Sequence, residues 1–229
     1  LPVLTRAISL IGPPAAGKSA LALRLAGNTG YAAFRLREHV PQALLAAAAA
    51  DATAARVGWV DDFTAMTSIH GFVERATRDR ETHTVVLDSF PGTETQVRLY
   101  LFLMRQLAPG CLLAAAELTA PEFVLRQRAG ARRVCGYCER DPLCDPRLPA
   151  ALSESDPRRC ARCDHLLGTR HGDDPSVYRV RMRRYRELSD GIRRAFEHAG
   201  IPVPLLVSGG TPAQTAGQFA ALFTPEESP

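Results

Sequence analysis

The stretch Gly12-Pro-Pro-Ala-Ala-Gly-Lys-Ser19 fits the phosphate-binding pattern GxxxxGK[ST] at every fixed position. Before it, residues 7–11 are short, apolar and β-prone, and after it residues 20–26 contain helix formers with alternating leucines. The loop is therefore expected to join a strand to a helix, so that backbone N–H groups and the helix N-terminus surround phosphate oxygens. This stretch predicts a bound nucleoside triphosphate.

Within the loop, Lys18 is expected to bridge the outer phosphates and the hydroxyl of Ser19 to face Mg²⁺. Lys18 is the single lysine among 28 lysines and arginines, and it lies where a compact ammonium is required and a planar guanidinium is not equivalent. The loop residues that we expect to contact the nucleotide are Gly12, Ala15, Ala16, Gly17, Lys18, Ser19 and Ala20.

The composition is that of a globular protein with a sizeable core. The chain has 229 residues, of which 46% are hydrophobic and 23% charged, and no apolar run approaches the ~20 residues of a membrane span. The first eleven residues show no basic segment or cleavage site, which predicts a cytoplasmic location. The net charge of +4 is modest, and 15 of the 27 arginines lie between residues 126 and 186, so the positive field is local.

Strand and helix patterns alternate along the chain, which predicts an α/β fold with a parallel sheet covered on both faces. Buried strands are predicted at 84–88, 111–117 and 201–207, and helices at 41–55, 63–78 and 212–223. Residues 89–96 are predicted to form a turn that opens a further helix, which continues to about residue 106. Asp88 ends its strand, and a carboxylate at such a tip beside a phosphate loop commonly serves Mg²⁺. Cys111 lies in an apolar strand and is expected to be a core residue.

Two CxxC pairs predict a metal site. Cys135 and Cys138 form the first pair, and Cys160 and Cys163 form the second. Such pairs turn four thiolates toward one tetrahedral Zn²⁺, which is structural because no position is left for water or substrate. The spacing between the pairs is slightly longer than usual, and Cys144 within it is an alternative ligand.

Arginines flank the cysteine unit on both sides, which indicates a hinged flap that delivers positive charge to a phosphoryl group in a site closed to water. A solvated helix face is the alternative for the arginines at 183, 184 and 186, because three neighbours cannot share one face.

Taken in order, these features resemble the adenylate kinase family of nucleoside monophosphate kinases, in its long form with a zinc-bearing lid. The phosphate loop is similar to that family's GxPGxGK segment, and residues 87–96, LDSFPGTETQ, are similar to its LDGFPRTxxQ. Residues 128–135, RAGARRVC, resemble RxxGRRxC, and residues 170–185 resemble an RxDD segment followed by RLxxY.

The resemblance implies a phosphate-loop kinase core with a five-stranded parallel sheet, formed by 1–30, 64–123 and 171–229. It also implies a helical acceptor-binding insertion at 31–63 and a lid at 124–170. ATP would be the phosphoryl donor and Mg²⁺ the cofactor, with Ser19 and Asp88 at the magnesium and Arg128 over the base of the donor. The transferring phosphoryl group would be held by Lys18, Arg132, Arg170 and Arg181.

The acceptor side departs from the family pattern. Ser89 and Gly92 stand where the family has a glycine beside the acceptor base and an arginine on the acceptor phosphate. Residues 31–34 also differ, so we expect a nucleotide acceptor other than AMP. Arg35 and Arg98 are the candidates for replacing the missing arginine. The residues expected to face the acceptor are Phe34, Arg35, Arg37, Ser89, Gly92 and Gln96.

The resulting hypothesis is an ATP-dependent kinase, active as a monomer on a nucleotide-like small molecule. The alternative is a nucleotide-binding module of weak activity whose zinc ribbon contacts a protein or RNA. An RNA-binding ribbon would be expected to interleave aromatic residues with its basic ones, and only Tyr137 lies within this one, which disfavours nucleic acid.

Overall fold

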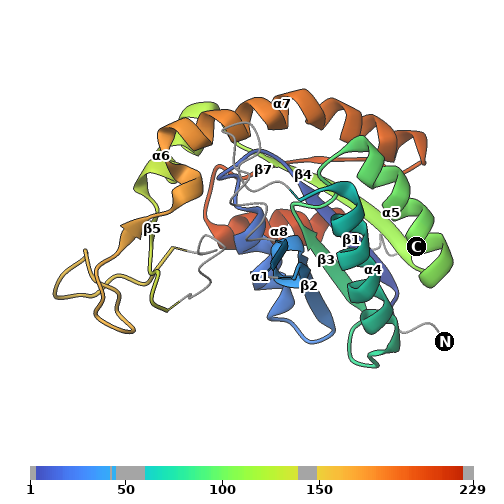
Figure 1. Ribbon diagram of the computed structural model, residues 1–229, viewed down its shortest axis with the longest axis horizontal. Coiled ribbons are helices and arrows are strands. Elements are labelled where there is room, and N and C mark those ends of the chain that lie inside the picture. The colour runs from blue at the N-terminus through green and yellow to red at the C-terminus, as the bar shows by residue number, and fades with distance from the viewer. Residues whose placement is uncertain (1–3, 42, 45–59, 139–148, 224–229) are drawn as a thin grey trace.

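Five parallel strands form the main sheet of the computed structural model, which describes residues 4–41, 43–44, 60–138 and 149–223 (Figure 1). The strands are β1 (Arg6–Ile11), β2 (Tyr31–Arg35), β3 (Thr84–Asp88), β4 (Leu112–Thr119) and β7 (Leu205–Val207). Their order is β2-β3-β1-β4-β7, which places β1 at the centre of the sheet. The predicted α/β fold with a five-stranded parallel sheet is confirmed.

The helices in the described ranges follow the strands in alternation. They are α1 (Lys18–Ala26), α2 (Leu36–His39), α4 (Asp62–Arg78), α5 (Glu94–Leu107), α6 (Glu122–Ala131), α7 (Pro175–His198) and α8 (Pro212–Phe223), with a short 3₁₀ helix, η1, at His171–Asp173. Three of them begin at an oxygen-bearing cap, because Asp61, Thr93 and Asp174 each accept a hydrogen bond from a backbone N–H of the first turn. No helix in these ranges is both long enough and apolar enough to cross a membrane.

Each face of the sheet carries its own apolar core. Alternate residues of β1 point to opposite sides, so that Ala7 and Ile11 pack with α4 and α5, whereas Ile8 and Leu10 pack with α1 and α6. The long helix α7 contributes to both cores, one through its first half and the other through its last turns. Burial on both faces explains why the central strands are apolar without a polar alternation.

The register of the central strands brings their carboxyl ends to one edge of the sheet. Leu10 of β1 is paired with Asp88 of β3, and Ile11 is paired with Glu117 of β4. The phosphate loop follows Ile11 directly. Ligands of parallel α/β sheets bind outside this edge, so the fold places the loop, the tip of β3 and the end of β4 around one position.

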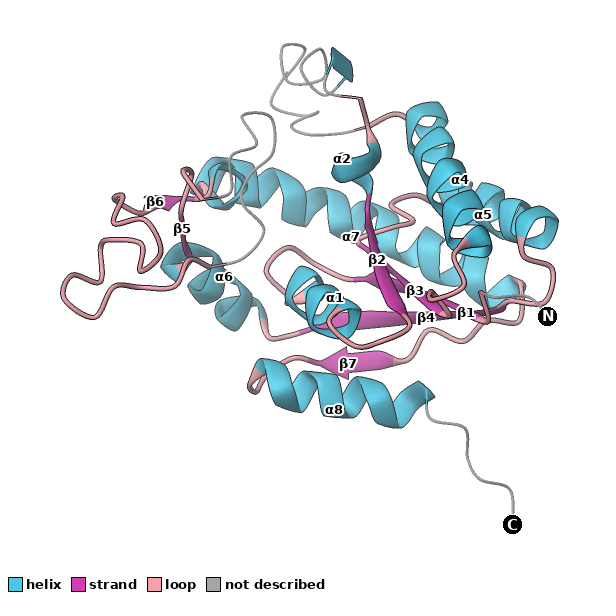
Figure 2. Ribbon diagram, turned by 90° about the horizontal axis from the view of Figure 1, so that it is seen from below, coloured by secondary structure: helices cyan, strands magenta, loops and turns pink. Residues whose placement is uncertain are grey.

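The lid projects from the end of α6, away from the main sheet (Figure 2). Its two stems form a short antiparallel pair, β5 (Arg133–Val134) with β6 (Gly168–Thr169). Between these strands, isolated bridges join Leu152 to Cys160 and Arg159 to Leu166.

Some boundaries differ from the sequence prediction. Residues 31–35, which we grouped with the acceptor insertion, form β2 of the main sheet and pair with β3. The last strand is shorter than predicted, at Leu205–Val207, because prolines at 202 and 204 cannot donate to a strand ladder. Most of the helix predicted at 41–55 lies outside the described residues, as does Cys144.

Candidate phosphoryl-transfer site

Glycine is required at two points of the phosphate loop. Gly12 has φ 135°, and a Cβ there would lie 2.1 Å from the carbonyl oxygen of Leu118 on β4. Gly17 has φ 94° and begins α1 without a side-chain cap. Because no side chain caps the first turn of α1, its backbone N–H groups face the loop and are suited to phosphate oxygens.

The ammonium of Lys18 is fixed inside the loop. Its Nζ donates to the carbonyl oxygens of Gly12 and Pro13, each at 2.7 Å, and only 9% of the residue is exposed. The helix thus begins on a lysine that points back into the loop preceding it. This arrangement holds a positive charge at the place where the sequence predicts the outer phosphates.

Charged groups from distant parts of the chain act on Lys18. Burial lowers its pKa to about 8, Asp88 opposes this shift, and three arginines add to it, namely Arg181, Arg170 and Arg132. Arg181 lies on α7, Arg170 directly precedes η1, and Arg132 directly follows α6. The structure therefore brings together the four residues that the resemblance assigned to the phosphoryl group, with the predicted magnesium carboxylate beside them.

A single buried carboxylate, Asp173, organises these arginines. Arg132 binds it through two hydrogen bonds, Nε to Oδ2 at 2.6 Å and Nη2 to Oδ1 at 2.7 Å. Arg170 and Arg181 approach Oδ1 at 4.0 and 3.9 Å, and Arg181 also donates to the carbonyl of Gly172 at 2.8 Å. One negative charge among three positive ones leaves the cluster cationic, as a polyanionic ligand requires. Asp173 belongs to the segment that resembles RxDD, but no role for it is predictable from the sequence.

Asp88 is buried at the tip of β3, where Ser89 Oγ donates to its Oδ1 at 3.1 Å and Arg35 Nε lies 3.9 Å from its Oδ2. Ser19 stands in the first turn of α1, partly buried. Carboxylate and hydroxyl oxygens are ligands that suit Mg²⁺, so this donor set fits the ion that the sequence predicts.

Two residues that replace family glycines adopt left-handed backbone conformations. Ala15 has φ 66° and Ser89 has φ 61°. Ala15 stands where the family that the phosphate loop resembles has a glycine, and such a replacement is mild only at a negative φ, which Ala15 does not have. A side chain in this region costs roughly 1–2 kcal/mol, so the loop and the β3 tip hold strain that glycine would relieve.

Arg128, predicted to cover the base of the donor, lies at the ends of β4 and β7. Its Nη1 donates to Ser208 Oγ at 3.1 Å, and its Nη2 donates to the Ser208 carbonyl. Ser208 Oγ in turn donates to the carbonyl of Thr119 at 3.1 Å. The sequence analysis did not single out Ser208, although its position after a strand and before two glycines marks a loop at the same sheet edge.

Phe34 is part of the core and does not line the acceptor side. Phe34 is fully buried, with 0% of its surface exposed. Its ring stacks on the ring of His39, with 5.0 Å between the ring centroids and 11° between the ring planes. The rings of Phe72 and Phe90 lie 5.1 and 5.5 Å away. The expected acceptor contact is therefore replaced by a packing role, because an apolar residue at a strand end gives no sign in the sequence of how deeply it is buried.

The two candidate replacements for the missing arginine differ in position. Arg35 ends β2, next to Asp88 at the tip of β3, and its side chain is 16% exposed. Arg98 lies on the surface of α5, 71% exposed, and pairs with Glu94 one turn away. Arg37 is in α2, partly buried. Arg35, not Arg98, shares a carboxylate with the phosphate site.

Gln96 links the starts of two helices. Its Oε1 accepts from the backbone N–H of Gly92 at 2.8 Å, and its Nε2 donates to Asp62 Oδ1 at 2.8 Å. Gln96 is 2% exposed. It fixes the loop that carries Gly92 against the first turn of α4, where Asp62 lies.

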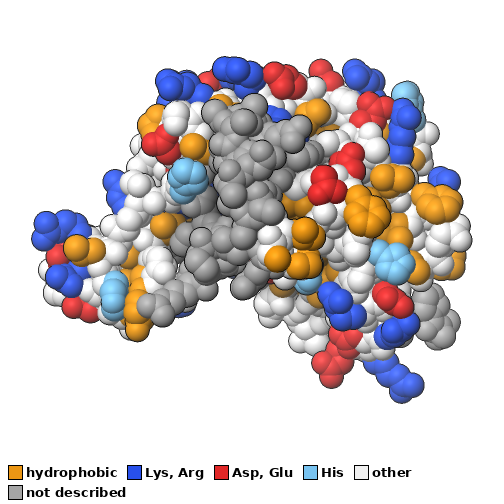
Figure 3. Space-filling model, in the orientation of Figure 1, with side chains coloured by type: hydrophobic (Ala, Val, Ile, Leu, Met, Phe, Trp, Pro, Cys, Tyr) orange, Lys and Arg blue, Asp and Glu red, His pale blue; other side chains and the backbone are white. Residues whose placement is uncertain are grey.

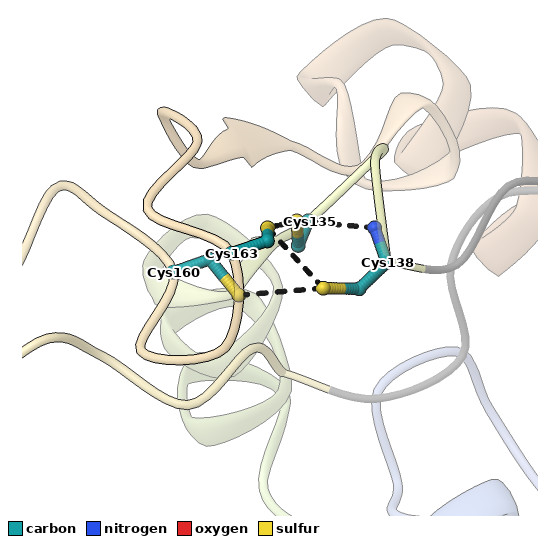
Figure 4. A group of neighbouring side chains, drawn as sticks. All are labelled: Cys135, Cys138, Cys160 and Cys163. Carbon is teal, nitrogen blue, oxygen red and sulfur yellow. Dashed lines mark hydrogen bonds between the residues drawn. The ribbon is translucent and has the colours of Figure 1, made fainter.

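The four cysteines of the two CxxC pairs converge in the lid (Figure 4). The Sγ atoms lie 3.4 Å apart for Cys135 and Cys163, 3.3 Å for Cys138 and Cys163, and 3.7 Å for Cys138 and Cys160. Four sulfurs at 2.3 Å from one tetrahedral ion would be about 3.8 Å apart. The cluster fits a metal ion such as zinc.

A hollow of about 730 Å³ opens on the lid surface beside the cysteines. The stacked rings of Tyr137 and His165, 3.9 Å between centroids, lie on its wall together with Arg159 and Leu166. None of its lining residues belongs to the phosphate loop, so this hollow is separate from the position where the charges converge.

The comparisons with known proteins identify the first part of the chain. The model of a family described as an AAA domain matches residues 8–139, which is more than half of the 229 residues. The match includes the phosphate loop and Asp88, and it stops before Cys160, Arg170 and Arg181. No curated protein matches the chain.

Proposed function

Since this chain belongs to the AAA domain family of phosphate-loop, kinase-like nucleotide-binding proteins, we propose that it is an ATP-dependent phosphotransferase resembling adenylate kinase. Its acceptor is a nucleoside monophosphate or a nucleotide-like molecule other than AMP. The observation that carries this proposal is the convergence of three arginines and Asp88 on Lys18, because two of the arginines come from a part of the chain beyond the family match.

On the donor side, the loop backbone and the start of α1 bind the phosphates of ATP, and Lys18 turns from the carbonyls of Gly12 and Pro13 to the outer phosphate. Ser19 and Asp88 would hold Mg²⁺, which would supply charge that neutralises the phosphates. Arg128 lies at the far end of the same sheet edge, near the position expected for the base.

The arginine cluster supplies the electrostatic part of the reaction. Phosphoryl transfer depends on positioning and on positive charge directed at the oxygens of the moving group. Asp173 holds the guanidinium groups of Arg132, Arg170 and Arg181 in place before the ligand arrives, so little reorganisation is needed during the reaction. Because Arg132 directly precedes β5 and Arg170 directly follows β6, both move with the lid stems, and closure of the lid would also exclude water.

Zinc is the metal that we propose for the lid. Four thiolates with CxxC spacing form a closed tetrahedral set, which is typical of structural zinc and leaves no position for catalysis. The role of the ion would be to keep the lid rigid, so that its stems carry Arg132 and Arg170 as a unit.

The test is product analysis with a panel of acceptors. The protein is incubated with ATP, Mg²⁺ and each of several nucleosides and nucleoside monophosphates, and phosphorylated products are detected by mass. We expect one acceptor other than AMP to be preferred in kcat/KM, and Lys18→Ala to abolish transfer. Gly92→Arg should raise activity on AMP, because a bidentate guanidinium–phosphate pair adds roughly 10- to 150-fold in recognition. AMP as the best wild-type acceptor would disprove the acceptor assignment, and no transfer to any acceptor would disprove the kinase.

A further inference from the structure

The hydroxyl of Tyr178 is a buried polar group without a hydrogen-bond partner in the part of the chain that the structure describes. Tyr178 is 6% exposed, and its ring packs in the apolar core that also contains Leu125 and Ala129 of α6. Burial of an unpaired hydroxyl is unfavourable, and phenylalanine would fill nearly the same space without it. A partner is therefore expected in another state of the protein, such as the state with ligand bound.

Tyr178 stands near the start of α7, beside the arginine cluster. Because helical side chains lean toward the N-terminus of their helix, the hydroxyl lies toward η1, which carries Asp173. Burial raises the pKa of this hydroxyl above its usual value, and the nearby charges of Glu122 and Asp173 raise it further. Arg126 and Arg181 act in the opposite direction. The hydroxyl thus keeps its proton near neutral pH and can donate a hydrogen bond to a carboxylate.

Asp173 is the carboxylate that ligand binding deprives of its partners. Its side chain is 2% exposed. Arg132 binds it through two hydrogen bonds, and Arg170 and Arg181 lie within 4.0 Å of its Oδ1. The proposed function requires these guanidinium groups at the phosphoryl group. Each one that turns away leaves the buried negative charge less compensated, which is strongly unfavourable unless another donor takes its place.

Glu122, the other carboxylate near Tyr178, is not in this situation. Its side chain is 49% exposed and pairs with Arg126 at 2.9 Å and with Arg186 at 2.6 Å. Neither arginine belongs to the cluster around Asp173. Solvent and these surface arginines therefore compensate Glu122 whether or not a ligand binds.

We propose that Tyr178 is a positioning residue, whose hydroxyl donates a hydrogen bond to Asp173 when the arginines of the cluster turn to the phosphoryl group. The inference rests on the proposed function, since it assumes that these arginines bind the γ-phosphoryl group of ATP. Tyr178 does not contact the ligand itself. It stabilises the carboxylate that the arginines leave, so their release costs less free energy and the ligand binds more tightly.

This exchange of partners distinguishes nucleotides that carry a γ-phosphoryl group from those that do not. ATP, or a non-hydrolysable analogue of it, draws the arginines from Asp173, and its binding depends on Tyr178. ADP has no group at that position, so the arginines stay on Asp173 and the hydroxyl has no part in ADP binding. A tyrosine that only packed the core would affect both nucleotides alike.

The experiment compares the two nucleotides by calorimetry, without turnover. The wild type and Tyr178→Phe are each titrated with ADP and with a non-hydrolysable ATP analogue, in the presence of Mg²⁺. Loss of one hydrogen bond to a charged group should weaken binding of the analogue ~10-fold or more, whereas the affinity for ADP should stay unchanged. The melting temperature of unliganded Tyr178→Phe should equal or exceed that of the wild type, because the hydroxyl has no partner to lose.

Two further variants separate this role from packing. Tyr100→Phe makes the same change in the other apolar core, at a side chain that is as deeply buried. The polar neighbours of that hydroxyl are Ser9 and Cys111, so both nucleotides should bind as they do to the wild type. Asp173→Asn removes the charge that Tyr178 compensates. In that background Tyr178→Phe should weaken analogue binding much less than it does in the wild type.

The outcomes distinguish the inference from the proposed function. Wild-type affinity of Tyr178→Phe for the analogue, an equal loss for ADP, or a loss of the same size in the Asp173→Asn background would each overturn the inference. If Asp173→Asn is too unstable to titrate, the comparison of ADP with the analogue decides alone. A wild type that does not bind the analogue would refute the proposed function. If analogue binding depends on Tyr178 as stated but no acceptor is phosphorylated, the inference holds and the kinase assignment fails.

Discussion

Lys18 combines two properties that seldom occur together in an ammonium, because it is nearly enclosed and it lies close to three arginines. Its retention of charge depends on the two carbonyls that it contacts and on Asp88. Replacing Lys18 by an uncharged residue therefore removes a positive charge from the position around which Asp88 and the three arginines lie.

We expect Lys18→Ala to abolish phosphoryl transfer and to weaken ATP binding, and Lys18→Arg to be nearly as damaging. The guanidinium is planar and larger than an ammonium, so it cannot occupy the loop in the same geometry. Single-turnover rates and ATP dissociation constants measure both effects. Transfer by Lys18→Ala at the wild-type rate would contradict the assignment of the loop.

The affinity for ATP should depend on pH through Lys18. In the unliganded protein its pKa is lowered to about 8, and an anionic triphosphate binds the protonated form. Affinity therefore changes little below about pH 7 and falls as the pH rises through 8, so that binding at pH 9 is roughly tenfold weaker than at pH 7. Titrations by fluorescence or calorimetry across this range provide the measurement.

Lys18→Arg is the matched control for this dependence, because arginine does not titrate below pH 12. Its weaker ATP affinity should be flat between pH 7 and pH 9. A wild-type affinity that stays constant over the same interval would show that Lys18 keeps its proton there.

At the scale of elements, the arginine cluster joins α6, η1 and α7 through Asp173. The buried ion cluster thus adds charged contacts between α6 and α7, which also pack in the same apolar core. The arginine cluster around Asp173 thus lies where the two stems of the lid meet the core. Figure 3 shows that further arginine side chains extend along the edge formed by α7, where they face solvent.

Asp173→Asn should destabilise the protein by ~3 kcal/mol, because removal of one partner leaves buried charge uncompensated. We also expect a lower kcat, since asparagine keeps one acceptor oxygen, and Arg132 thus loses one of its two hydrogen bonds together with the ionic attraction. Urea unfolding gives the change in stability. Asp174→Asn is the control, because that exposed neighbour caps α7 and asparagine caps a helix about as well as aspartate, so stability should change little. Equal losses in the two variants would argue against a special role for Asp173.

Most elements of this fold are predictable from the sequence, because apolar segments of strand length alternate with helical ones and the loop at 12–19 fixes where the sheet edge lies. The charged cluster is only partly predictable. Arg132 and Asp173 are 41 positions apart, and no local pattern pairs them. The backbone of Ala15 and the burial of Phe34 were also beyond prediction, because φ and depth depend on tertiary contacts rather than on residue type.

For the whole molecule, the two apolar cores lie on the main sheet, whereas the lid holds together around four sulfurs and a two-residue strand pair. Neither the sheet nor the helices on it require the lid for their packing. The core and the lid should therefore respond separately to loss of metal.

We expect one zinc ion per chain by elemental analysis of protein purified without chelators. Chelation or Cys160→Ser should unfold the lid and spare the core, since structural zinc of this type contributes on the order of 10 kcal/mol to the unit that it folds. Tryptic cleavage within 133–169 reports on the lid, and circular dichroism reports on the core. Cys111→Ser, outside the cluster, should leave the zinc content unchanged. Metal-free native protein with a protease-resistant lid would contradict the zinc assignment.

The pairing of β5 with β6 has a consequence for how this lid relates to the rest of the chain. Arg133 and Thr169 face each other across one rung of an antiparallel ladder, so the chain leaves the core and returns to it within about 5 Å. A tight turn could bridge that gap with the flanking helices left where they are. The lid is thus an insertion whose two ends lie side by side. Deleting it or exchanging it for another segment would leave the fold of the core unchanged.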